Sequence, residues 1–112
     1  MKIEVYENNG GGLTLVIIKH NEVVGMYYGF EYGGANILTD AIGQLIEDDE
    51  AYKQWDGDLL EITMEEWPEV TLDKLYDMIS IDTLIAEVDE NNIITLYTNS
   101  MGTAAMKSFG LE

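Results

Sequence analysis

Acidic side chains are the residues of this chain with the most potential for chemistry, because it carries 22 of them and no cysteine. Asp48-Asp49-Glu50 and Asp56-Gly57-Asp58 supply carboxylate oxygens, which are the ligands that calcium prefers. Neither segment fits the calcium loop of an EF-hand, because no glutamate follows Gly57 by six positions. Among so many acids, a pair at the spacing of a glycosidase site would arise by chance. We therefore expect neither a metal site nor a catalytic carboxylate pair.

Residues for nucleophilic, zinc or phosphate chemistry are also lacking. His20 is the only histidine, and a single histidine without cysteine cannot complete a zinc site unless carboxylates join it. The three serines lie outside any nucleophile-elbow sequence. The glycines at 10–12 are not followed by the lysine and hydroxyl residue of a phosphate-binding loop. We expect no enzyme activity and no cofactor, and we interpret His20 as a surface turn residue.

Charge is distributed unevenly along the sequence, whose formal net charge is −17. Residues 40–90 contain 17 acids against two lysines, a net charge of −15, whereas residues 91–112 contain one acid and one lysine. Arginine, the usual bidentate partner of phosphates and carboxylates, is absent. Direct binding to nucleic acid, to a nucleotide or to an anionic membrane is therefore disfavoured on electrostatic grounds.

Hydrophobic periodicity indicates the elements that must carry these residues. Alternating apolar and polar residues predict strands, and the continuous apolar run at 15–18 predicts a strand that is covered on both faces. Helical spacing predicts two amphipathic helices, with Asn36 and Thr71 as their N-caps. The predicted strands span residues 2–7, 13–19, 23–30, 83–88 and 93–98, and the predicted helices span residues 37–47 and 72–79.

The middle of the chain is the least regular part. Residues 51–55 either extend the preceding helix or form a second short one, and residues 59–67 fit either a strand or a short helix. Residues 31–35 are interpreted as a loop and residues 101–109 as a short helix or a tail. The acids at 47–50 oppose the macrodipole at the expected end of a helix, and such local conflicts sometimes mark functional sites.

These elements predict an α+β fold. Its sheet is an antiparallel β-meander of three N-terminal strands plus a later hairpin, with the helices packed on one face. The length fits a single globular domain, 1–112, in which Leu111-Glu112 resembles a vector-derived tail. The apolar run at 15–18 is too short to span a bilayer, and residues 1–5 lack the apolar region of a signal peptide. Because cysteine is absent, we expect a cytoplasmic protein.

The acidic middle of the chain is the predicted interaction surface. Dense acids accompany both tryptophans there, and each tryptophan either belongs to the core or anchors an interface. We expect these acids to form one continuous negative surface that attracts a basic protein partner. The predicted partner-binding residues are Glu47, Asp48, Asp49, Glu50, Trp55, Asp56, Asp58, Glu65, Glu66, Trp67 and Glu69.

In composition alone, the chain resembles two groups of small acidic proteins. One comprises DNA mimics that inhibit nucleic-acid enzymes, and the other comprises immunity proteins that neutralise basic nuclease toxins. The resemblance implies a protein-binding module that inhibits a basic partner. The alternative is a small structural or oligomerising domain with no activity of its own, joined through the aromatic strand at 23–30, whose acidity serves solubility.

Overall fold

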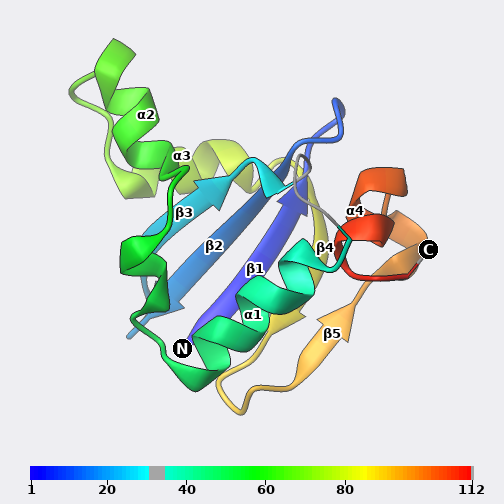
Figure 1. The fold of residues 1–112 in the computed structure, drawn as a ribbon. Helices are drawn as coiled ribbons and strands as arrows, with labels where there is room; N and C mark the ends of the chain where they lie inside the picture. Colours follow the sequence, from blue (N-terminus) through cyan, green and yellow to red (C-terminus); the bar gives the residue numbers. More distant parts are fainter. Residues whose placement is uncertain (31–34, 112) are drawn as a thin grey trace.

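The computed structural model describes residues 1–30 and 35–111, and its centre is a five-stranded antiparallel sheet (Figure 1). The order across the sheet is β3-β2-β1-β4-β5, so the predicted α+β class, meander and later hairpin are confirmed. Residues 31–34 of the predicted loop lie outside the described residues. The strands are β1 (Lys2–Glu7), β2 (Leu13–Lys19), β3 (Glu22–Tyr28), β4 (Thr83–Val88) and β5 (Ile94–Leu96).

Two tight turns join the strands of the meander. In the first, Oδ1 of Asn8 accepts hydrogen bonds of 2.9 Å from the N–H groups of Gly10 and Gly12. In the second, His20 and Asn21 have φ angles of 51° and 63°, the conformation that a two-residue type I′ hairpin requires. The interpretation of His20 as an exposed turn residue is confirmed.

One face of the sheet is covered by α1 (Ile37–Glu47) and α4 (Thr103–Ser108) (Figure 1). The predicted helix at 37–47 is confirmed, and it buries Leu38, Ala41, Ile42 and Leu45 at helical spacing. Asn36 occupies its N-cap position with a φ of 68°, but the Asn36 side chain makes no capping hydrogen bond. This face holds the larger of the two apolar clusters.

The opposite face is covered by α3 (Leu72–Ile79), which lies behind the sheet in Figure 1. Its predicted span is confirmed, and Oγ1 of Thr71 accepts a hydrogen bond of 3.3 Å from the N–H of Lys74 as the predicted cap. Leu75 of this helix packs with Tyr6, Val16 and Met26.

The prediction that the helices share one face of the sheet is therefore wrong. The reason lies in β2, whose side chains alternate between the two clusters. Leu15 and Ile17 contribute to the cluster under α1, whereas Val16 contributes to the cluster under α3. A strand that is apolar on both sides needs cover on both sides, so the run at 15–18 required a second layer of helix.

The other elements settle the alternatives that the sequence left open. Residues 51–54 form a separate 3-10 turn, η2 (Ala51–Gln54), and residues 59–66 form helix α2 (Leu59–Glu66). A second 3-10 turn, η3 (Thr98–Ser100), precedes α4. β3 and β5 are shorter than predicted. Among residues 1–30 and 35–111, no helix is both long and apolar enough to cross a membrane.

Candidate functional site

Residues 47–69, which hold the predicted partner-binding residues, follow one side of the molecule. They run from the end of α1 through η2 and past the edge strand β3 to the tip of α2, which projects from the body (Figure 1). The N–H of Tyr28 donates a hydrogen bond of 3.2 Å to the carbonyl of Gly57, and Tyr27 forms an isolated β-bridge with Asp58. The segment thus occupies part of the β3 edge, through which the alternative interpretation would join two copies.

The predicted residues differ in exposure and in role. Asp58 is half-buried and serves as the N-cap of α2, because its Oδ1 accepts a hydrogen bond of 2.9 Å from the N–H of Leu60. Trp55 is also half-buried, whereas Trp67 is 59% exposed. The remaining predicted residues are all exposed: Glu47, Asp48, Asp49, Glu50, Asp56, Glu65, Glu66 and Glu69.

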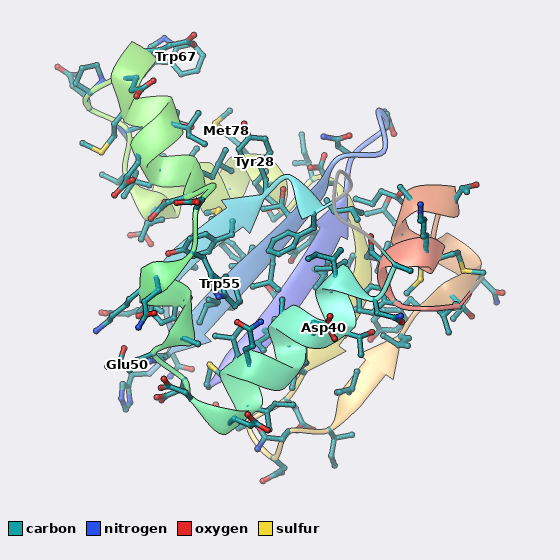
Figure 2. All side chains as sticks on the ribbon, in the orientation of Figure 1. Tyr28, Asp40, Glu50, Trp55, Trp67 and Met78 are labelled. Carbon is teal, nitrogen blue, oxygen red and sulfur yellow. The ribbon has the colours of Figure 1, made fainter. Side chains whose placement is uncertain are left out.

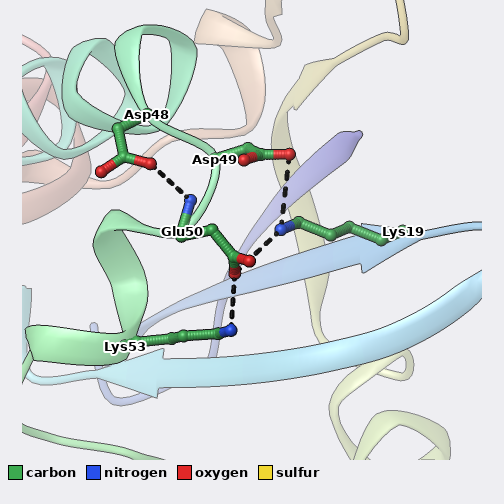
Figure 3. A network of polar contacts seen from close by, with 5 residues as sticks. All are labelled: Lys19, Asp48, Asp49, Glu50 and Lys53. Atoms are coloured by element: carbon green, nitrogen blue, oxygen red, sulfur yellow. Dashed lines mark hydrogen bonds and ion pairs between the residues drawn. The ribbon is translucent and has the colours of Figure 1, made fainter.

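The acids at 48–50 are held in a polar network with two lysines (Figure 3). Nζ of Lys19 lies 3.5 Å from Oδ2 of Asp49 and 3.4 Å from Oε2 of Glu50, and Nζ of Lys53 lies 2.8 Å from the same Glu50 oxygen. Oδ1 of Asp48 accepts a hydrogen bond of 3.0 Å from the N–H of Glu50. The hydrogen bond from Lys53 lowers the pKa of Glu50. Two lysines therefore offset much of the charge of these three acids.

The tip of α2 presents its acids differently. Glu65, Glu66 and Glu69 form no hydrogen bond or ion pair through their side chains with any described residue. They flank the exposed Trp67 in the sequence, and Glu66 and Glu69 share a surface hollow with it; Figure 2 shows Trp67 at the far end of the helix. Other large apolar side chains of α2 and α3 are exposed as well, namely Ile62, Met64 and Met78. The tip therefore combines unpaired negative charge with apolar surface.

Trp55 belongs to an aromatic cluster beside β3. Its ring meets Tyr27 edge-to-face with centroids 5.5 Å apart, and it meets Phe30 in the same manner at 6.2 Å. Its Nε1 donates a hydrogen bond of 3.2 Å to Oε1 of Gln44 on α1. Burial is the main cause that raises the pKa of Tyr27 to about 12. Trp55 is thus fixed by packing and by a hydrogen bond.

A cavity of about 390 Å³ opens beside this cluster, between α1 and the segment 55–56. Its walls include Tyr28, Phe30, Asp40, Trp55 and Asp56. Only Trp55 and Asp56 of these were among the predicted partner-binding residues. The aromatic residues at the end of the third predicted strand were the signal that could have identified Tyr28 and Phe30 as binding residues. No pattern in the sequence indicated that Asp40 lies near residues 55–56.

Within residues 1–30 and 35–111, no group of three or more histidine, cysteine or acidic side chains is arranged to hold a metal ion. Comparison with protein-family models, with curated proteins and with solved structures finds no match for this chain.

Proposed function

We propose that this chain is a protein-binding module, without enzymatic activity, that uses its acidic side against a basic protein partner. The proposed partner is a nucleic-acid enzyme, which the chain inhibits as a DNA mimic or as an immunity protein. The absence of cysteine supports a cytoplasmic setting, where thiol oxidation plays little part.

The observation that carries the proposal is the environment of Trp67 at the tip of α2. A large aromatic side chain is 59% exposed there, and the three glutamates that flank it in the sequence have no ion pair among the described residues. Exposed ion pairs contribute only ~0–1 kcal/mol each, so charge alone gives a partner little affinity. An exposed tryptophan supplies the apolar contact that binding hot spots use, while the acids speed association.

The size of the molecule supports a partner that normally binds DNA. Residues 47–69 contain ten acids and one lysine, a net charge of −9. Duplex DNA carries one charge per ~1.7 Å of its axis, so this charge matches roughly 15 Å of duplex. The longest dimension of the molecule is 39 Å, which accommodates that length. The segment 47–69, which carries these acids, runs along one side of the molecule (Figure 1), and the acids at 48–50 are partly offset by lysines.

The test is capture of basic proteins from the cell that makes this chain, compared between matched variants. The double variant Glu65→Gln/Glu66→Gln and the variant Trp67→Ala should each lose most of the captured partner. The control Glu22→Gln/Glu90→Gln changes the net charge equally, at two exposed positions outside 47–69, and should retain it. Added duplex DNA should displace the partner, because the two compete for one basic surface.

Capture that the tip variants leave unchanged would contradict the proposal. If instead no basic protein is captured and the charge variants only aggregate, the acidity serves solubility. The third outcome is that the chain associates with itself, which light scattering at low and moderate salt detects. Association of two like-charged copies strengthens as salt rises, whereas binding to a basic partner weakens.

A further inference from the structure

The cavity beside Trp55 joins three parts of the chain on the α1 side of the sheet. Tyr28 is the last residue of β3, and Phe30 follows two positions later. Asp40 lies in the first turn of α1, and Trp55 and Asp56 lie in the connection between η2 and α2. Figure 2 shows Tyr28, Asp40 and Trp55 around this region. Its volume of about 390 Å³ falls in the range of small-molecule sites, which is ~300–1,000 Å³.

Aromatic rings form much of the wall. The contacts of Trp55 with Tyr27 and Phe30, and its hydrogen bond to Gln44, fix the indole before any ligand arrives. Oε1 of Gln44, which also lines the cavity, already accepts a hydrogen bond from the indole N–H of Trp55. The faces of tryptophan, tyrosine and phenylalanine rings attract cations.

Two carboxylates lie at the rim. The side chains of Asp40 and Asp56 are exposed and form no hydrogen bond or ion pair with any described residue. Among the described residues, no lysine lines the cavity. An anion would meet two negative charges here without a positive partner, whereas a cation would meet complementary charge and an aromatic wall together.

We infer that this cavity binds the cationic side chain of a lysine or arginine from the partner. The inference rests on the proposed function, in which the partner is a basic protein. It adds a second point of contact with that partner, separated from the tip at Trp67 by helix α2. The tip provides an exposed apolar anchor, and the cavity selects a single basic residue of the partner by charge and by aromatic contact.

The first experiment uses a background in which Trp67→Phe leaves Trp55 as the only tryptophan. Fluorescence and the indole N–H signal of Trp55 are followed during titration with Nα-acetyl-lysine amide and with Nα-acetyl-arginine amide. Nα-acetyl-norleucine amide is the uncharged probe of similar shape. We expect a saturable response to at least one cationic probe, a weaker response at high salt, and none to the norleucine probe. An equal response to norleucine, or no saturable response to either cation, would overturn the inference.

Variants at the rim provide the second experiment. Asp40→Asn and Asp56→Asn should each weaken probe binding about two- to fivefold, as expected for loss of one exposed charge partner. Asp73→Asn is the control, since Asp73 is an exposed acid in the first turn of α3 on the other face of the sheet. Unchanged NMR spectra outside the cavity would establish that the variants fold.

Partner capture then separates the two proposals. The inference requires that Asp40→Asn/Asp56→Asn reduce capture of the partner as well as probe affinity. If these changes weaken the probe but leave capture intact, the cavity serves a free organic cation and the docking inference is wrong. If the tip variants abolish capture while the rim variants do not affect either measurement, the proposed function stands and the inference falls.

Discussion

Oε1 of Glu4, on the central strand β1, accepts a hydrogen bond of 2.6 Å from the hydroxyl of Tyr76 on α3. The hydroxyl of Tyr6 donates to the same oxygen over 3.1 Å. The two hydroxyls satisfy a carboxylate that is only partly exposed to water beneath the helix. This contact ties the second helical layer to the middle of the sheet through a polar group, within an otherwise apolar cluster.

Removing the Tyr76 hydroxyl should therefore destabilise the fold. Tyr76→Phe should lower the free energy of unfolding by about 1–2 kcal/mol, because a partly buried carboxylate loses a charge-assisted hydrogen bond. Tyr97→Phe is the matched control, since the Tyr97 hydroxyl also donates to a glutamate, Glu87, but at an exposed site. It should change stability by less than about 0.5 kcal/mol. Urea denaturation of both variants tests this, and equal losses would contradict the role given to Glu4.

The buried tyrosines should make the protein sensitive to alkaline pH. Burial is the main cause that raises the pKa of Tyr6 and of Tyr27, the latter to about 12 from an ordinary value of 10.0. A group whose pKa is higher in the folded state contributes stability that is complete below its unfolded pKa and is lost as pH rises. Stability should therefore fall between pH 10 and 12. Tyr27→Phe should flatten part of this fall, as measured by urea denaturation across that pH range.

The two tryptophans should contribute very differently to stability. Trp55→Ala should cost about 2–3 kcal/mol, because it removes a half-buried ring that packs on Tyr27 and Phe30. Trp67→Ala should change stability by less than about 0.5 kcal/mol, because its ring is 59% exposed. Thermal or urea unfolding of the two variants measures the difference. A large loss from Trp67→Ala would mean that this residue is structural and would remove it as a dedicated anchor.

Lys19 should contribute more to stability than an exposed lysine such as Lys74. Its side chain is only 18% exposed, contacts two acids and lies 5.1 Å from the ring centroid of Tyr52. Lys19→Met should cost about 1 kcal/mol, because Asp49 and Glu50 would then face the negative end of α1 with less compensation. Lys74→Met, at an exposed position, removes the same charge and should cost less than about 0.5 kcal/mol. Added salt should reduce the difference between the melting temperatures of the two variants, because it screens the lost ion pairs.

Local signals in the sequence were sufficient for most elements of the fold. The alternation at 2–7 predicted β1, and the helical spacing at 37–47 predicted α1 with its bounds. Thr71 marked the start of α3, because its hydroxyl provides a cap that any helix of this sequence would use. These features depend on residues within a few positions of one another.

The placement of α3 and the assembly of the cavity could not be predicted in the same way. The face that α3 covers depends on which face of β2 is left uncovered by the other helices. That is a property of the whole sheet and not of the sequence of α3. The cavity is lined by Phe30, Asp40 and Trp55, which lie far apart in the sequence. No hydrophobic periodicity in the sequence indicates that they come together. The contact of Lys19 with Asp49 and Glu50 could not be predicted either, because Lys19 lies on β2, about 30 positions away in the sequence.

The pairing of β1 with β4 also sets an order of events during folding. The meander β1-β2-β3 closes through short turns, whereas Ile3 must wait for Val88 from the other end of the chain. Long-range pairing of this kind is slow, so we expect β1 to form an open, apolar edge of the meander before β4 pairs with it. We expect the acidic segment between β3 and β4 to repel other copies at that stage, so that its charge limits aggregation of the nascent sheet until the final hairpin docks.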